Sequence, residues 1–355
     1  MGVYAPAVID LHDPPALAAH CTAHRVDPQQ GERLARLVLR YGVRFDEAAG
    51  KLRTAVPSAW MEPLRPRALR VVQTQDSQAD GATKWLFETK RGERIESVLL
   101  RIASGRRALC LTIQSSCPVA CRFCASGFPG KPKSLELDSM LGQVLHARQV
   151  LRDEGEELRN LVFMGMGEPL LEEELLHQTL HCLLDPRGFA FNPGHVMVSS
   201  VGLPEGMLRL AEAFPSVRQA LSLHSARQDV RERLIPAASA HPVAELQRVV
   251  SELGARTGEL VLIEYILLAG VNDGPEDEQA LCSWLKGLPV KLNLIPFNMP
   301  GDEGGSGSID ATLRPTPRPE REAFARRMRD SGVPTTLRHS LGRDIGAACG
   351  QLGRK

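Results

Sequence analysis

Apolar residues recur in two alternating patterns from about residue 105 onward. Short runs rich in Leu, Ile and Val, typical of buried strands, are each followed by a longer segment with apolar residues at helical spacing. Six such units in series and a final strand candidate predict a parallel sheet with helices on its outside. The expected strands are 107–114, 160–167, 195–202, 218–225, 259–270, 290–298 and 333–340, and the expected helices are 134–151, 172–184, 204–214, 242–256, 274–287 and 318–331.

The first hundred residues follow a different pattern, in which two segments with helical spacing precede three short strand candidates separated by polar turns. This change of pattern predicts an N-terminal accessory domain over residues 1–100, helical and then a β meander, and a core domain over residues 101–355. The helical segments are 29–42 and 45–52, and the strand candidates are 69–75, 82–90 and 94–102.

Composition narrows the class of protein. Hydrophobic residues at 43% and charged residues at 24% are ordinary for a soluble globular protein. The 43 Lys and Arg residues nearly balance the 42 Asp and Glu residues, so no global basic field indicates a nucleic-acid partner, although a local basic face would suffice. The N-terminus lacks the features of a secretory signal, and no window reaches about 18 uninterrupted apolar residues. We expect a cytoplasmic protein with no membrane partner, whose eight cysteines are thiols, metal ligands or catalysts.

Chemistry in a parallel sheet gathers at the C-terminal ends of the strands, where the loops begin. In this chain "MGMGEP", "SSVG", "SLHS" and "NLIPFN" close four of the expected strands, and a group of cysteines follows the first strand. Any one of these segments is typical of a strand end, but together at one rim they indicate a ligand site. The segment 299–317, rich in Gly, Pro and Ser, is expected to be a mobile loop at this rim.

Three cysteines stand in one short loop with the spacing C-x3-C-x2-C, namely Cys117, Cys121 and Cys124. A structural zinc site or a ferredoxin-type cluster would require a fourth protein ligand, so three thiolates indicate an iron centre with one open position. This spacing on the first loop resembles that of the radical S-adenosylmethionine (SAM) superfamily. The resemblance implies an α/β fold with a partial (β/α)6 barrel, and a [4Fe-4S] cluster whose fourth iron binds the amine and carboxylate of SAM.

The other residues at this rim fit the same cofactor. Gly165 and Gly167 let the backbone come close, and the Glu168 carboxylate can accept a hydrogen bond from the methionyl ammonium. Polar groups at the later strand ends are available for the carboxylate, ribose and adenine of SAM. The predicted SAM-binding residues are Gly167, Glu168, Ser199, Ser222, Leu223, His224 and Asn298.

Two further cysteines distinguish families within this superfamily. Cys110 precedes the first cluster ligand by seven residues, and Cys349 lies near the C-terminus in "DIGAACGQL". With "MGMGEPLL", "SLH" and "NLIPFN", these cysteines resemble the motifs of the RlmN/Cfr family of radical methyltransferases, over roughly residues 8–353. That family methylates an adenine ring carbon in RNA.

The family resemblance implies a mechanism that uses two molecules of SAM per turnover. One methylates Cys349, and the other is cleaved to a 5′-deoxyadenosyl radical that takes a hydrogen from the S-methyl group. The resulting methylene radical adds to the adenine carbon. Release requires attack of Cys110 on the Cys349 sulfur, which leaves a disulfide, and Glu96 matches the family's position for the base that removes the ring proton.

The substrate implied by the resemblance is an adenosine of 23S ribosomal RNA, and some members of the family also modify a transfer RNA. Carbon 2 is favoured over carbon 8 because it is the commoner target. The resemblance also implies an electron donor such as flavodoxin or ferredoxin. An RNA contact is expected in the N-terminal domain, and "SGRR", "FPGKPK" and the arginines between 314 and 355 provide local positive charge.

Two positions depart from the family pattern and bear on the choice of substrate. Ser116 replaces a glycine before Cys117, and Val201 stands where a hydroxylic residue is usual. The residues also leave two alternatives open. One is a radical SAM enzyme that acts on a different small molecule or nucleoside, and the other is a non-catalytic iron–sulfur RNA-binding protein in which Cys110 and Cys349 are incidental.

Overall fold

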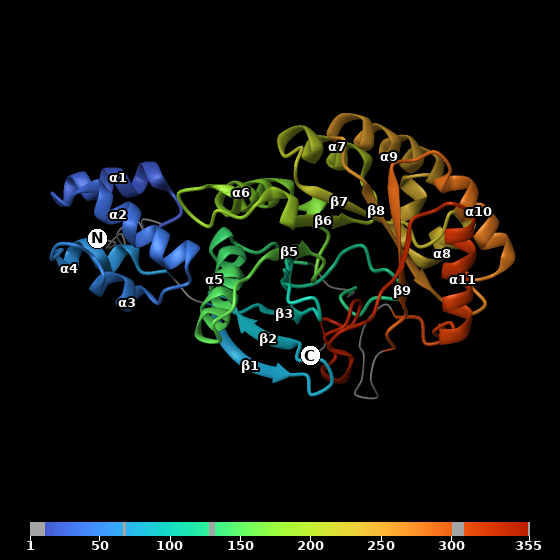
Figure 1. Ribbon diagram of the computed structural model, residues 1–355, viewed down its shortest axis with the longest axis horizontal. Coiled ribbons are helices and arrows are strands. Elements are labelled where there is room, and N and C mark those ends of the chain that lie inside the picture. The colour runs from blue at the N-terminus through green and yellow to red at the C-terminus, as the bar shows by residue number, and fades with distance from the viewer. Residues whose placement is uncertain (1–10, 67–68, 128–131, 300–308, 354–355) are drawn as a thin grey trace, which may run out of the picture.

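The computed structural model describes residues 11–66, 69–127, 132–299 and 309–353, and in these residues ten strands form one sheet (Figure 1). The strands lie in chain order; neighbours from β1 to β4 pair antiparallel, and every pair from β4 to β10 is parallel. Among the described strands β1 and β10 do not pair, so the barrel stays open. The strands are β1 (Arg70–Asp76), β2 (Thr83–Glu88), β3 (Arg94–Arg101), β4 (Arg107–Cys110), β5 (Asn160–Phe163), β6 (Val196–Ser200), β7 (Arg218–Ser222), β8 (Val261–Leu267), β9 (Val290–Pro296) and β10 (Thr335–Leu337).

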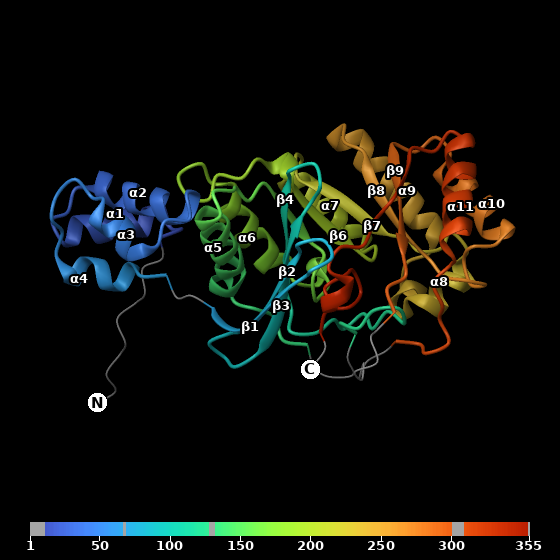
Figure 2. The same cartoon turned by 60° about the horizontal axis from the view of Figure 1, so that its bottom comes forward.

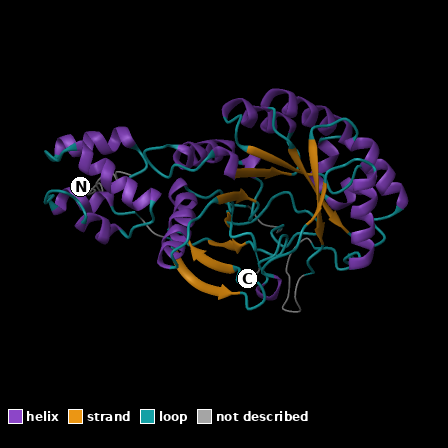
Figure 3. Ribbon diagram, viewed as in Figure 1, coloured by secondary structure: helices purple, strands orange, loops and turns teal. Residues whose placement is uncertain are grey.

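Helices cover the outside of the parallel strands (Figure 3). In α9, for example, Leu246, Val249, Val250 and Leu253 recur at helical spacing and are buried, so one apolar face packs on the core. No helix in the described part of the chain is both long and apolar enough to cross a membrane. The helices of the core are α5 (Leu137–Asp153), α6 (Glu173–Leu184), α7 (Pro204–Ala213), α8 (Gln228–Leu234), α9 (Val243–Thr257), α10 (Pro275–Leu285) and α11 (Arg318–Asp330).

The N-terminal helices lie beside α5 (Figure 1). Arg148 of α5 donates a hydrogen bond to the carbonyl of Leu39, and Arg44 forms an ion pair with Asp153 at 2.8 Å. Apolar side chains of these helices and of the barrel belong to one continuous hydrophobic core. The N-terminal elements are α1 (Pro14–Ala23), α2 (Pro28–Ala35), the π-helical turn η1 (Arg36–Arg40), α3 (Phe45–Gly50) and α4 (Ser58–Met61), and the 3-10 turns are η2 (Glu62–Leu64), η3 (Pro169–Leu171), η4 (Pro193–His195), η5 (Pro236–Ala240) and η6 (Arg343–Ile345).

The predicted strand–helix units and the final strand are all present, which confirms the α/β class and the partial barrel. The apolar pattern missed α1, α4 and α8, because each of these short helices buries only one to three residues. The antiparallel strands β1 to β3 continue directly into the core sheet through the β3–β4 pair, and the boundary placed at residue 100 stays a prediction. Residues 300–308 of the expected rim loop and 128–131 of "FPGKPK" lie outside the described residues.

Candidate active site

A cavity of about 540 Å³ lies inside the barrel and is lined mainly by the strand ends and the loops that follow them. Segments from both ends of the core contribute to its wall, since the loop after β4 and the C-terminal segment meet there. Glu96, Leu223 and Asn298 are not part of this lining. The predicted site residues that line it are Cys110, Cys117, Cys121, Cys124, Gly167, Glu168, Ser199, Ser222, His224 and Cys349.

The loop after β4 is folded by backbone hydrogen bonds, which set the spacing of its three cysteines. The N–H of Cys117 donates to the carbonyl of Ser126 at 2.8 Å, and the N–H of Cys124 donates to the carbonyl of Cys121 at 3.1 Å. These bonds turn the loop back on itself. The three thiols therefore face one cavity although no helix or strand carries them.

The chemistry of this thiol set fits a metal cluster. Burial, and then the neighbouring cysteine thiolates, raise the pKa of Cys117 to about 12 and the pKa of Cys121 well above its ordinary value. Three thiolates can share such a site only with a metal cation that offsets their charge. Within the described ranges no three His, Cys, Asp or Glu side chains converge as ligands of a single ion would. A [4Fe-4S] cluster instead binds each cysteine through a different iron, so its ligands stand apart.

The loop after β5 brings its backbone against the cysteine loop. The N–H of Glu168 donates to Oε1 of Gln114 at 3.0 Å. Gly167 has a φ of 103°, and a Cβ at this position would lie 2.8 Å from the Cβ of Gln114. Side-chain-bearing residues rarely adopt this conformation, so glycine is required for the close approach of the two loops.

We expect Gly167→Ala to lose more stability than Gly287→Ala, the matched control. Both glycines have a positive φ, but a Cβ at Gly287 would meet nothing within 4 Å. The control should lower the free energy of unfolding by about 1 kcal/mol through backbone strain alone. Gly167→Ala should lower it by about 2–4 kcal/mol, because steric overlap adds to the strain. Denaturant unfolding of both variants measures the difference, and equal losses would contradict the close approach.

Glu168 is buried and joins two strand ends. One carboxylate oxygen accepts a hydrogen bond from the N–H of Leu170 at 3.1 Å, and the other accepts one from the N–H of Val201 at 2.9 Å. Burial raises the pKa of Glu168 to about 7 in spite of these bonds. A carboxylate has about four lone-pair positions, so Glu168 can also accept from a ligand ammonium. Val201 uses only its backbone here, so its departure from the family pattern leaves this contact intact.

The ends of β6 and β7 place two hydroxyl groups together, with Oγ of Ser199 3.4 Å from Oγ of Ser222. Arg231 of α8 is 1% exposed and binds both strand ends, because it donates to the carbonyls of Ser222 at 2.9 Å, of Val201 and of Leu223. Leu223 thus contributes its carbonyl to this arginine rather than a side chain to the cavity. The sequence pattern missed Arg231 because it missed α8.

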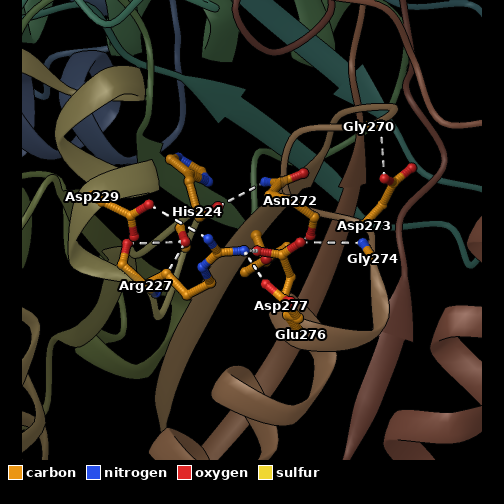
Figure 4. Close-up of polar contacts among 11 residues, drawn as sticks. His224, Arg227, Asp229, Gly270, Asn272, Asp273, Gly274, Glu276 and Asp277 are labelled. Carbon is orange, nitrogen blue, oxygen red and sulfur yellow. Dashed lines mark hydrogen bonds and ion pairs between the residues drawn. The ribbon is translucent and has the colours of Figure 1, made fainter.

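His224 is held as a neutral hydrogen-bond donor. Its Nδ1 accepts from the N–H of Ile266 at 3.1 Å, which leaves the ring proton on Nε2, and burial lowers its pKa to about 3. Figure 4 shows the polar network behind it, in which Nδ2 of Asn272 donates to the His224 carbonyl at 2.7 Å. In the same network Arg227 reaches three carboxylates at 3.2–3.4 Å. These are Asp229, Glu276 and Asp277.

The C-terminal segment, residues 346–353, docks on the cysteine loop. The N–H of Ala125 donates to the carbonyl of Gly350 at 2.8 Å, and Oγ of Ser126 donates to the carbonyl of Leu352 at 2.9 Å. Figure 2 shows this end of the chain beside β2 and β3. Docking places Cys349 in the wall of the cavity.

Cys110 and Cys349 are both free thiols in this wall. Burial, and then the charge of Cys349, raise the pKa of Cys110 to about 12, and burial raises the pKa of Cys349 to about 11 although its side chain is open to the cavity. The positive charge of Arg338 acts against burial and lowers the pKa of both thiols. Its guanidinium lies 3.8 Å from the buried carboxylate of Glu264. This ion pair was not predicted from the sequence. Its only sign in the sequence is that each of the two apolar strand segments, 259–270 and 333–340, contains a charged residue.

Two of the predicted site residues support the lining rather than form it. Nδ2 of Asn298 donates to the carbonyl of Cys349 at 3.1 Å, and its buried Oδ1 has no hydrogen-bond partner among the described residues. Glu96 forms an ion pair with Lys84 at 3.2 Å and accepts a hydrogen bond from the N–H of Gly353 at 2.5 Å. The structure therefore places Glu96 under the end of the C-terminal segment.

An open parallel barrel with three cysteines on its first loop, beside a close-packed glycine loop, defines a radical SAM protein. Residues 111–281 match the model of the radical SAM superfamily. The crystal structure of a radical SAM methyltransferase from Sphaerobacter thermophilus is similar to this chain with a TM-score of 0.85 and 31% identity. The match covers 97% of this chain and 99% of that one.

Two curated relatives identify the family within this superfamily. A probable RNA methyltransferase of Rhodopirellula baltica is 42% identical over 99% of this chain and 89% of its own length. A probable dual-specificity RNA methyltransferase RlmN of Thermus thermophilus is 39% identical over 92% of this chain and 90% of its own length. The chain belongs to the RlmN/Cfr family of radical SAM methyltransferases. Its cofactors are a [4Fe-4S] cluster and SAM, of which two molecules are used per turnover.

Proposed function

We propose that this protein methylates a ring carbon of an adenosine in 23S ribosomal RNA, and also in a transfer RNA. The observation that carries the proposal is the single cavity that joins the three cluster cysteines with Cys110 and Cys349, from opposite ends of the core. The relatives named RNA methyltransferases support RNA as the substrate. Carbon 2 is favoured over carbon 8 because it is the commoner target in the family.

Cys117, Cys121 and Cys124 would hold the cluster, and the bound cluster and SAM would supply the methyl group, the abstraction of a hydrogen atom and one-electron exchange. The loop of Gly167 and Glu168 would hold the methionyl end of SAM. The hydroxyls and the imidazole at the later strand ends would donate to its polar groups, and Leu223 would support them through the bond from Arg231 to its carbonyl. These hydroxyls and this imidazole belong to Ser199, Ser222 and His224.

Cys349 carries the methyl group in this proposal. Its thiolate takes a methyl from SAM and forms a thioether, and after loss of one hydrogen atom the S-methylene radical adds to the adenine carbon. The RNA is then covalently bound through a carbon–sulfur bond. Asn298 orients this step, because its amide holds the carbonyl of Cys349.

Cys110 releases the product. The adduct first loses the ring proton and one electron. The Cys110 thiolate then attacks the sulfur of Cys349, so that a disulfide forms while the carbon–sulfur bond to RNA breaks and its carbon takes up a proton. A reductant must restore both thiols before the next turnover, and we assign that role and the supply of single electrons to a flavodoxin or ferredoxin in the cytoplasm.

Glu96 is the proposed base for the ring proton. In the present conformation its carboxylate is engaged by Lys84 and by the N–H of Gly353. It can serve as the base only after the end of the C-terminal segment has withdrawn. Motion of that segment is therefore part of the proposed cycle.

The proposal is tested by mass spectrometry of RNA after anaerobic incubation with reconstituted protein, reductant and methyl-deuterated SAM. We expect methyladenosine that keeps two of the three deuterium atoms, since one is lost from the S-methyl group. Chromatography distinguishes carbon 2 from carbon 8. Retention of all three would establish direct methyl transfer instead, and 5′-deoxyadenosine without methyladenosine would favour a small-molecule substrate.

A further inference from the structure

A second cavity, of about 1000 Å³, lies where the N-terminal helices meet the barrel. Its wall comes from the end of η1, the β3–β4 turn, the end of α5 with the loop after it, and the segment before β6. It thus borders the beginnings of β4, β5 and β6, whereas the cysteine loop follows the end of β4. We name it the basic cavity after the arginines in its wall, which are Arg40, Arg106, Arg107, Arg148, Arg152 and Arg159.

Most of this positive charge is not neutralised. Glu156 and Glu157 are the carboxylates in the wall, and Arg107 already pairs with Glu156. Arg152 pairs with Glu47 at 2.8 Å. The other four arginines of the wall form no ion pair with any carboxylate of the described residues. These four are Arg40, Arg106, Arg148 and Arg159.

Arg148 lies in the wall of the basic cavity and is held there without an ion pair to a carboxylate of the described residues. Its guanidinium donates to the carbonyl of Phe189 at 2.9 Å and to that of Leu39, and it lies 4.1 Å over the ring of Phe191. Burial, and then the neighbouring Arg40, lower the pKa of Arg148 to about 9. A partly buried cation whose hydrogen bonds go only to carbonyls attracts an anionic ligand.

The basic cavity is connected to the active site through Arg106, which lines both cavities. Arg106 lies in the β3–β4 turn, so this turn separates the two. Tyr41 also lines the basic cavity and is 53% exposed, with the guanidinium of Arg40 at 5.8 Å from the centre of its ring. Arginines that line a groove beside an exposed aromatic ring are typical of sites for single-stranded nucleic acid.

We propose that the basic cavity binds the phosphodiester backbone of the RNA substrate, on the nucleotides that flank the adenosine held in the active-site cavity. Arg106 contacts the phosphate nearest the target, Arg40 and Arg159 contact the next ones, and Tyr41 stacks on an unpaired base. This assignment rests on the proposed function, since it takes RNA as the substrate. It gives "SGRR" at the β3–β4 turn a specific role.

The test removes three exposed charges from the basic cavity and compares the result with three removed elsewhere. The test variant combines Arg40→Gln, Arg106→Gln and Arg159→Gln. The control removes three exposed arginines of α9 and α11, namely Arg248, Arg256 and Arg318, in the same way. Binding of a fluorescent 23S ribosomal RNA fragment to the reconstituted proteins is measured at several salt concentrations.

We expect the test variant to raise the Kd for RNA at least about tenfold at 0.1 M salt, with little change in the control. The slope of log K against log salt should become shallower by about 2, which corresponds to roughly 0.7 for each of three lost phosphate contacts. Cleavage of SAM to 5′-deoxyadenosine should be unchanged in a variant that carries only Arg40→Gln and Arg159→Gln, because neither of these arginines lines the active-site cavity.

Equal affinity and salt slope in the test and control variants would overturn the inference. Loss of inorganic triphosphate binding with unchanged RNA binding would also overturn it, because the cavity would then serve a small anion. Failure of the proposed function is a separate result. In that case the unsubstituted protein would bind the RNA through the basic cavity but form no methyladenosine.

Discussion

Replacing Cys349 with alanine should abolish RNA methylation while the protein still cleaves SAM to 5′-deoxyadenosine. The thiol is the proposed methyl carrier, and no other residue in the cavity wall can replace it without leaving its own position. Cys110, the other thiol of the wall outside the cysteine loop, lies on β4 and has a pKa raised to about 12 by burial. The cluster cysteines are separate from Cys349 in the chain, so reductive cleavage of the cofactor should persist.

The control for this experiment is Cys282→Ala. Cys282 is a partly buried cysteine of α10 whose Sγ contacts Sδ of Met328 at 3.5 Å, away from the active-site cavity. It should retain methylation, which excludes a general effect of removing a thiol. Both products are measured by liquid chromatography and mass spectrometry of the same reaction. Methyladenosine from Cys349→Ala at the level of the control would refute the methyl-carrier role and favour direct transfer.

The parallel core could be predicted from the sequence because strands buried on both faces are continuous apolar runs, as in β8 and β9. The cysteine spacing likewise predicts the cluster loop, since local spacing carries the ligand pattern. The polar side chains that hold the strand ends in place could not be predicted from the sequence. Arg231 binds three carbonyls from a short helix, and nothing in its local sequence distinguishes it from an exposed helical arginine.

Two predicted site residues illustrate why motif position alone does not fix a side chain's role. Leu223 stands between two residues that line the cavity, but its own side chain is buried in the core just after the end of β7. Asn298 belongs to the predicted "NLIPFN" motif, yet its amide holds the carbonyl of Cys349, some fifty residues further along the chain. Such long-range contacts depend on how the C-terminal segment docks, which no local pattern encodes.

The basic cavity could not be predicted from charge counts. Its arginines come from three separate segments, and the chain as a whole carries a formal net charge of only +1. Only folding brings Arg40 of the N-terminal helices close to Arg148 of α5. A balanced protein can therefore present a concentrated positive surface, because its carboxylates lie elsewhere.

Replacing Cys110 with alanine should stop the reaction after the RNA has been joined to Cys349. Without a thiolate to attack the Cys349 sulfur, the carbon–sulfur bond to the adenine has no route of release. Radiolabelled RNA should therefore migrate with the protein on a denaturing gel, in an amount that approaches one RNA per active protein. A thiol reductant should not cleave this adduct, because a thioether, unlike a disulfide, does not exchange with thiols.

The double variant, with Cys110 and Cys349 both replaced by alanine, provides the matched control for this adduct. It lacks the carrier as well as the resolving thiol, so it should cleave SAM and leave the RNA free. An adduct in the double variant would place the bond on another residue. Free methylated RNA from the Cys110 variant would mean that a different group resolves the intermediate. In that case Cys110 and Cys349 would line the same cavity only because the C-terminal segment packs there, and not because the two thiols react with each other.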